Sequence, residues 1–186
     1  MKHSDQYPHS SFIVTGASAS GKTTLTREAA RNGYHYLPAH TTRSLRKGES
    51  QGVDMVQVPE NQFREAFESG AYLEPTLDFS LLHASGIYYG TPRIWVGKLA
   101  KDGYCAAPTS TRIAGVVHVA SGVEWLHLTC PDLVREERLR SRGITESELE
   151  TRMTAGDSII VPDGARIIDS SKFSPAAILN MIQGVL

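Results

Sequence analysis

The segment that most restricts the fold is a glycine-bearing loop between an apolar run and a helix-forming run. Residues Gly16–Thr23 read G-A-S-A-S-G-K-T, which fits the pattern G-x-x-x-x-G-K-[ST]. Ser11–Thr15 before it favours a strand, and Lys22–Arg31 after it contains good helix formers and no helix breaker. Glycines let such a loop turn successive backbone N–H groups inward, toward the oxygens of an anion. The sequence therefore predicts a phosphate-binding loop.

Two side chains of this loop carry distinct chemistry. Lys22 would bring a cation to the β and γ phosphates of a nucleotide, and Thr23 would offer its hydroxyl to Mg²⁺ as the metal ligand. A chance glycine turn is the alternative, which the strand before the loop and the helix after it disfavour. The residues expected to bind the nucleotide are Gly16, Ala17, Ser18, Ala19, Ser20, Gly21, Lys22, Thr23 and Thr24.

Strand-like and helix-like segments alternate along the rest of the chain, which predicts an α/β fold with a parallel core sheet flanked by helices. The expected strands are residues 11–15, 34–37, 52–58, 86–89, 104–107, 124–129 and 166–168. The expected helices are residues 22–31, 92–101, 132–141 and 145–155, with two more beginning at Pro59 and Ser174. We expect one domain over residues 11–186 after a polar tail at residues 1–10.

Composition excludes several classes of protein. The formal charge of −1, from 19 basic and 20 acidic residues, argues against a broadly cationic nucleic-acid binder. The sequence has no apolar run of membrane-spanning length and no secretory signal. Cys105 and Cys130, both expected in buried strands, are too few for a disulfide framework or a cysteine metal site. These features predict a cytoplasmic protein that binds neither nucleic acid nor membrane; they leave the oligomeric state open.

A basic block follows the first helix and second strand. Arg43 and Arg46 are three residues apart, so two guanidinium groups could hold one phosphate dianion. Tyr89 could donate its hydroxyl to the same phosphate. The alternatives are a solvated basic turn, since Lys47 follows Arg46, and a half-buried strand tyrosine.

The order of these motifs resembles the guanylate kinase family, P-loop enzymes that move the γ-phosphate of ATP onto GMP. The block T-T-R-x-x-R-x-G-E at residues 41–49 and the block Y-Y-G-T-P at residues 88–92 carry the resemblance. It implies ATP and Mg²⁺ as cofactors and an acceptor-binding subdomain at about residues 40–91. It further implies that Arg43, Arg46 and Tyr89 hold the acceptor's phosphate, while Glu74 and Thr91 contact guanine.

The charged helices near the C-terminus resemble the family's lid, here at about residues 137–156. Arg138 and Arg142 are four residues apart and share a helix face, and Arg152 follows on the next helix. The resemblance implies that these arginines close over the ATP phosphates, so Lys22, Arg43, Arg138, Arg142 and Arg152 are the expected catalytic residues. A surface helix with internal ion pairs is the alternative.

The sequence departs from the family pattern at several positions. Ala39 replaces a serine that helps to hold the base, and Met55 replaces a tyrosine that touches the acceptor phosphate. The family's acidic D-x-D signature corresponds here to a run without carboxylates, from which Thr109, Thr111 and Arg112 are candidate acceptor ligands. The stretch Pro75–Ser85, with Asp78 and His83, is longer than in the family. Asp78 could replace the lost acidic charge.

We therefore expect an ATP-dependent phosphotransferase whose small-molecule acceptor already bears a phosphate. A GMP-type nucleoside monophosphate is the first expectation. The missing acids leave open a non-guanine phosphomonoester, such as a modified nucleotide or ribose 1,5-bisphosphate, because the related ribose 1,5-bisphosphate kinases also lack them and carry an arginine after this strand. An inactive nucleotide-binding module is a third alternative, which the intact loop Gly16–Thr23 disfavours.

Overall fold

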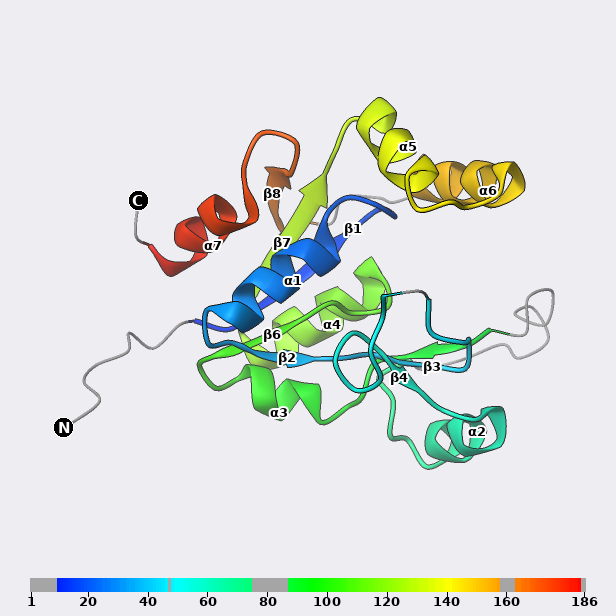
Figure 1. The fold of residues 1–186 in the computed structure, drawn as a ribbon. Helices are drawn as coiled ribbons and strands as arrows, with labels where there is room; N and C mark the ends of the chain where they lie inside the picture. The colour runs from blue at the N-terminus through cyan, green and yellow to red at the C-terminus, as the bar shows by residue number, and fades with distance from the viewer. Residues whose placement is uncertain (1–9, 47, 75–86, 158–162, 185–186) are drawn as a thin grey trace.

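A computed structural model describes residues 10–46, 48–74, 87–157 and 163–184, with the side chains of 155–157 left out (Figure 1). Its strands are β1 (Phe12–Gly16), β2 (His35–Leu37), β3 (His40–Thr41), β4 (Val56–Gln57), β5 (Tyr89–Gly90), β6 (Tyr104–Ala106), β7 (Glu124–Thr129) and β8 (Arg166–Asp169). Its helices are α1 (Lys22–Arg31), α2 (Glu60–Glu68), α3 (Trp95–Leu99), α4 (Thr111–Ser121), α5 (Asp132–Arg140), α6 (Glu146–Asp157) and α7 (Pro175–Gln183).

The core is a parallel sheet in the order β2-β6-β1-β7-β8. β1 lies at its centre, and every residue from Phe12 to Thr15 is buried. Parallel strands need crossover connections, which the helices supply, and both faces of the sheet are therefore covered. This arrangement confirms the α/β fold predicted from the alternation of segments.

Alternate residues of the central strands belong to two hydrophobic layers, one on each face of the sheet. Val14 and Leu126 pack toward α1 and α7, whereas Ile13 and Trp125 pack toward α3 and α4. Trp125 also donates its indole N–H to the Thr15 hydroxyl at 2.9 Å. The period of two along each strand thus produces both layers, and it leaves the carboxyl ends of the strands free to form a site.

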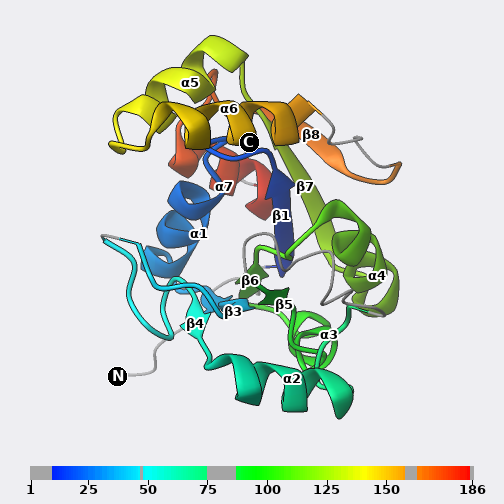
Figure 2. The same ribbon diagram turned by 90° about the vertical axis from the view of Figure 1, so that its right-hand side faces the viewer.

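A second, smaller sheet in the order β4-β3-β5 follows β2 in the chain. β3 pairs parallel with β4 and antiparallel with β5. Phe63 from α2 packs with Tyr72 and Tyr88 to give this unit a core of its own. In Figure 2 this unit and the α5–α6 pair lie at opposite ends of the view, flanking the carboxyl end of β1.

The expected elements differ from the structure in several places. The strand expected at residues 86–89 is wrong for residues 87 and 88, since β5 is Tyr89–Gly90; residue 86 lies outside the described residues. The strand expected at residues 52–58 is wrong for residues 52–54, which form a turn with Gly52 at φ 73°, so that only Val56–Gln57 is a strand. The helix expected at residues 92–101 is limited to Trp95–Leu99. Cys130 lies one residue beyond β7 and is partly exposed, so its expected place in a buried strand is also wrong.

Helix α4 was not expected from the sequence. Its residues include Gly115 and several valines, which have weak helix propensity. The helix begins because the Ser110 side chain accepts the N–H of Ile113 at 3.2 Å. It persists because Ile113 and Val117 are buried against the sheet, a tertiary contact that local propensity does not report.

An ion pair joins α1 to the loop before β4. Asp54 is buried, and its Oδ1 accepts from Arg27 Nε at 2.9 Å while its Oδ2 accepts the N–H of Ser50 at 2.9 Å. Arg27 also donates to the carbonyl of Gly48 at 3.0 Å. One side chain therefore holds the smaller unit against the core at a helix that begins in the phosphate-binding loop.

Replacing Arg27 by alanine should lower the free energy of unfolding by about 1–3 kcal/mol, because it leaves the Asp54 carboxylate buried without its cation. Arg31→Ala is the matched control on the same helix; its pair with Glu28 is exposed and should be worth at most about 0.5 kcal/mol. Denaturant unfolding of both variants measures the difference. Equal losses would show that the Arg27–Asp54 pair does not contribute specifically.

Candidate active site

The loop after β1 has the backbone that its glycines require. Gly16 and Gly21 have φ values of 143° and 100°. A Cβ atom at Gly16 would lie 2.3 Å from the carbonyl oxygen of Leu128, so no other residue fits between β1 and β7. Ala19 is the one non-glycine residue with positive φ in the described ranges, at 64°. The loop is thus held in a strained, preformed shape at the centre of the sheet edge.

Lys22 folds back over this loop. Its ammonium donates to the carbonyls of Gly16 and Ala17 at 2.7 and 2.8 Å. Burial, together with the charges of Arg142, Arg135 and Arg46, lowers the pKa of Lys22 to about 8. The ammonium therefore lies among other cations, a setting that an anion in the loop would relieve.

A cavity of about 360 Å³ opens beside the loop. Loop residues Ala19 and Gly21 line one side, Arg138 and Arg142 another, and the segment from Ser170 to Ile178 a third. Among the described residues, the buried Oγ atoms of Ser20 and Ser170 have no hydrogen-bond partner. The cavity thus adjoins the phosphate-binding loop, and the Ser170 hydroxyl in its lining is a polar group that a ligand could satisfy.

The α5–α6 pair contacts the loop directly. Arg138 donates to the carbonyl of Ala19 at 3.1 Å and contacts Cys130 Sγ at 3.4 Å. Arg135, which is 4% exposed, donates to the carbonyl of Ser18 at 3.3 Å. Ala19 packs in one apolar cluster with Leu139 and Leu149. The pair of helices is therefore coupled to the loop through both polar and apolar contacts.

Arg142 and Arg152 face the same region from the end of this pair. Helix α5 ends at Arg140, so the expectation that Arg138 and Arg142 share a helix face is wrong, although both line the cavity. The neighbouring Arg152 and Arg138 contribute, after burial, to lowering the pKa of Arg142. Arg152 keeps a 3.4 Å pair with Glu148.

Arg43 is largely committed to protein partners. It forms a bidentate pair with Glu49, at 2.7 and 2.9 Å, and donates Nε–H to the Tyr89 hydroxyl at 3.0 Å. Nη1 also donates to the carbonyl of Ser44 at 2.8 Å. Arg43 therefore holds Tyr89 and Glu49 in place and has little donor capacity left.

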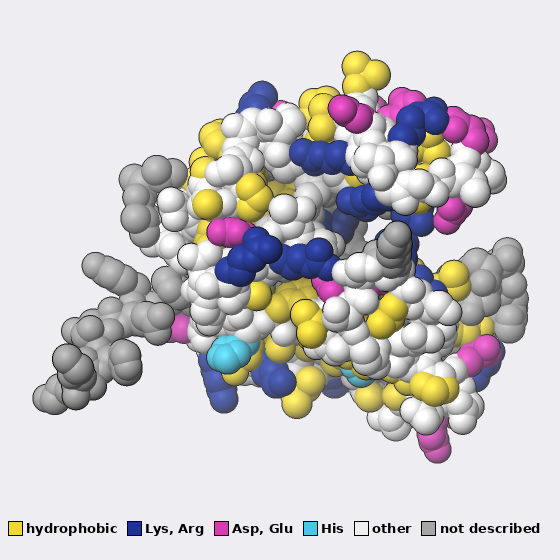
Figure 3. All heavy atoms as spheres, viewed as in Figure 1, with side chains coloured by type: hydrophobic (Ala, Val, Ile, Leu, Met, Phe, Trp, Pro, Cys, Tyr) yellow, Lys and Arg dark blue, Asp and Glu magenta, His cyan; other side chains and the backbone are white. Residues whose placement is uncertain are grey.

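Arg46 has the freer guanidinium of the two. Its ion pair with Glu49 is long, at 4.0 Å, and burial and the charges of Arg43 and Arg152 lower its pKa. The influence of Arg46 on Lys22 and of Arg152 on Arg46 places all three cations around one space. Figure 3 shows Lys and Arg side chains along the hollow between the α5–α6 pair and the smaller unit. This hollow is suited to an oxyanion-rich ligand.

Glu74, Thr91 and Thr109 form one hydrogen-bonded cluster. The Thr91 N–H donates to both carboxylate oxygens of Glu74 at 2.9 Å, and the Thr109 hydroxyl donates to Glu74 Oε1 at 2.7 Å. The Thr91 side chain is fully buried, and its hydroxyl donates to Thr109 Oγ1 at 3.2 Å. The three residues thus meet although they lie far apart in the chain.

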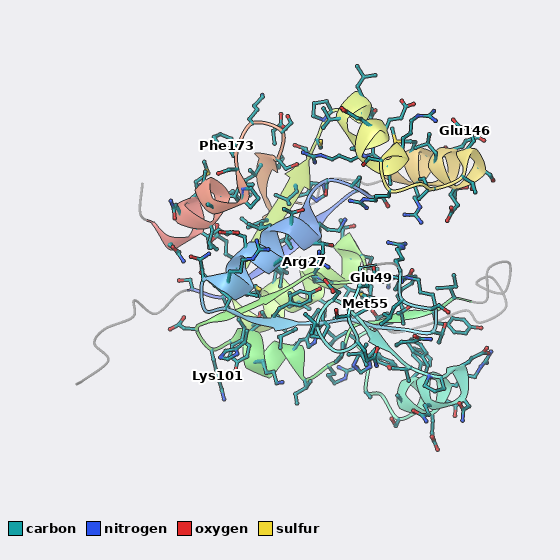
Figure 4. The ribbon with its side chains drawn as sticks, viewed as in Figure 1. Arg27, Glu49, Met55, Lys101, Glu146 and Phe173 are labelled. Atoms are coloured by element: carbon teal, nitrogen blue, oxygen red, sulfur yellow. The ribbon has the colours of Figure 1, made fainter. Side chains whose placement is uncertain are left out.

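The remaining sequence-predicted positions lie at the start of α4 and in the apolar layer that contains Ile13 and Trp125. Thr111 begins α4, and Arg112 follows it with an exposed side chain. Ala39 is buried between β2 and β3, and Met55 packs against the same apolar layer. In Figure 4 Glu49 and Met55 lie across from Arg27 on α1. The stretch Pro75–Ser85, with Asp78 and His83, lies outside the described residues, as do residues 1–9.

Sequence reasoning missed two parts of the site. Arg135 is one, and its signal was present: it precedes Arg138 by three residues on the same helix. The segment from Ser170 to Ile178 is the other, and it carries no motif. Within the described ranges, no three His, Cys, Asp or Glu side chains gather as a metal-binding group. No helix in those ranges has the length and apolar character of a membrane span.

Comparison with curated proteins finds sequence relatives. The chain is 31% identical to the guanylate kinase of Desulfotalea psychrophila over 153 residues, which covers 79% of this chain and 72% of the relative. It is 31% identical to that of Cupriavidus metallidurans over 151 residues, covering 78% and 67%. For the guanylate kinase of Chlamydia trachomatis the identity is 28% over 151 residues, covering 79% and 64%. No protein-family model matches the chain.

Solved structures support the fold. A guanylate kinase from Anaplasma phagocytophilum superimposes with a TM-score of 0.58 at 20% identity, covering 94% of this chain and 84% of that one. A gluconokinase from Sinorhizobium meliloti gives a TM-score of 0.51 at 17% identity, covering 96% and 92%. The sequence relatives, which are 31% identical over most of this chain, show that the chain is a kinase of the guanylate kinase family, and its fold agrees with this assignment.

Proposed function

We propose that this protein transfers the γ-phosphate of ATP to the phosphate of a GMP-type nucleoside monophosphate. The observation that carries the proposal is the shared cationic hollow. Lys22 and the arginines of the α5–α6 pair border it on one side, and Arg46 borders it on the other. Two phosphorylated substrates that meet between these groups would have their charges offset at the point of transfer.

The donor would occupy the loop and the cavity beside it. The triphosphate would lie along Gly16–Thr24, and its adenine end would enter the cavity lined by Arg138 and Ser170. ATP phosphates would displace Lys22 from the carbonyls of Gly16 and Ala17. Lys22 would then stabilise the charge of the transferring phosphoryl group.

The phosphates of the nucleotide would supply more ligands to Mg²⁺ than the protein would. Thr23, exposed at the start of α1, offers one hydroxyl ligand, which agrees with the small number of protein ligands that Mg²⁺ takes beside phosphates and water. When bound, the ion would offset phosphate charge. The other residues act independently of it: Arg138, Arg142 and Arg152 would cover the phosphates.

The acceptor would bind between the smaller unit and the core. Arg46 and Tyr89 would hold its phosphate, with Arg43 contributing through the Tyr89 hydroxyl that it orients. Glu74 would accept a hydrogen bond from the base, and Thr111 and Arg112 would border it from α4. Thr91 could donate its hydroxyl to the base only if that hydroxyl no longer donated to Thr109 Oγ1. Positioning of the two phosphates in line requires no covalent intermediate.

Two segments of the chain would have separate roles in this reaction. Residues 40–91 would act as the acceptor-binding subdomain and residues 137–156 as the lid. The separate β4-β3-β5 sheet and the contacts of Arg135 and Arg138 with the loop support these roles. Small phosphorylated molecules would be the partners, and the cytoplasm, which contains them, the location.

A non-guanine phosphomonoester remains the second candidate for the acceptor. Ala39 and Met55 lack polar groups for a guanine nucleotide, and residues 108–112 bring Arg112 but no carboxylate. ADP release from Mg-ATP should therefore be measured with GMP, dGMP, AMP, UMP, CMP and ribose 1,5-bisphosphate. Preference for GMP supports the proposal, whereas turnover of ribose 1,5-bisphosphate with little GMP use supports the second candidate.

Lys22→Ala should abolish transfer and leave the fold intact, because the side chain stabilises phosphate charge and no core contact depends on it.

In the wild type, ATP affinity should fall above pH 8 by up to about tenfold per pH unit, since the lysine of the empty site loses its proton there. The variant should show no such fall. Wild-type turnover by Lys22→Ala would contradict this role.

Glu74→Gln should reduce kcat/KM for GMP by about tenfold or more, because one carboxylate oxygen becomes an amide donor and a charged acceptor is lost. The KM for ATP should remain close to the wild-type value, which serves as the internal control. Unchanged kinetics with GMP would mean that Glu74 does not recognise the base.

A further inference from the structure

The cluster of Glu74, Thr91 and Thr109 limits what an acceptor can meet at the base end of the site. A carboxylate oxygen has two lone pairs for hydrogen bonds. Oε1 of Glu74 already accepts from the Thr109 hydroxyl at 2.7 Å and from the Thr91 N–H at 2.9 Å. From the described residues, Oε2 accepts only its share of that same N–H, also at 2.9 Å. One oxygen is therefore filled and the other has one open position.

We infer that Thr109 is a specificity-determining, positioning residue that leaves Glu74 a single open acceptor site, so that the protein uses purine nucleotides with one N–H donor as readily as those with two. The inference rests on the proposed function. Guanine presents two neighbouring donors, N1–H and the 2-amino group, whereas hypoxanthine presents N1–H alone. Only one of the two guanine donors would find a partner on Glu74.

Among the described residues, the segment around Thr109 adds no second carboxylate for the amino group. Residues 108–112 contribute hydroxyls and the Arg112 guanidinium. Thr91 fixes the orientation of the Thr109 hydroxyl. Thr109 Oγ1 accepts from Thr91 Oγ1 at 3.2 Å, and the backbone N–H of Thr109 donates to Thr91 Oγ1 at 3.3 Å. The Thr109 hydroxyl proton is thereby directed at Glu74. The 2-amino group would gain little on binding, so its loss should cost little.

The test compares kcat/KM for GMP and IMP, two nucleotides that differ only in the 2-amino group. The wild type should prefer GMP by less than about tenfold, where a site that pairs both donors rejects the analogue much more strongly. Thr109→Ala frees Oε1 and its surroundings, so the preference for GMP should rise by about tenfold or more. Thr109→Ser keeps the hydroxyl and should retain the wild-type ratio.

The outcomes separate this inference from the proposed function. A wild-type preference above about tenfold, or an unchanged ratio in Thr109→Ala, overturns the inference while GMP kinase activity stands. Equal losses with both nucleotides in Thr109→Ala also overturn it, because they indicate a merely structural role. Absence of transfer to both nucleotides in the wild type overturns the proposed function itself. The thermal midpoints of the variants, measured alongside, report whether each has folded.

Discussion

The pairing of β1 between β6 and β7 is the constraint on which the site depends. It buries Phe12 to Thr15 and ends at Gly16, where the carbonyl of Leu128 leaves no room for a side chain. The chain must therefore turn sharply at the sheet edge, where Lys22 folds back over the loop that follows. The same pairing places the starts of α1, α4 and α5 at that edge.

Charge organises the space above this edge. The charges of Arg46 and Arg142 both lower the pKa of Lys22, although the three residues come from separate parts of the fold. Arg43 donates most of its N–H groups to Glu49, Tyr89 and Ser44. In the proposed reaction, Lys22, Arg46 and Arg142 would therefore neutralise most of the charge of a bound phosphate, and a substrate that supplies anions on both sides would fit this distribution.

Around Glu74, in contrast, hydroxyl and backbone N–H groups satisfy a carboxylate. Thr109 donates to Glu74 at 2.7 Å at a position where the family signature has an acid. A second carboxylate there would repel Glu74, whereas the hydroxyl anchors it. The loss of acidic residues therefore does not leave Glu74 unsupported, and the Thr109 hydroxyl occupies part of the hydrogen-bonding capacity of its carboxylate.

The sequence by itself determined the loop Gly16–Thr23, the alternation of strands and helices, and the family, because these depend on local spacing and on residue types that few other arrangements tolerate. Only the tertiary structure decided three other features: helix α4, which burial of Ile113 and Val117 stabilises; the place of Arg135 against Ser18; and the meeting of Glu74 with Thr109. Each depends on contacts between segments far apart in the chain, which periodicity and propensity do not encode.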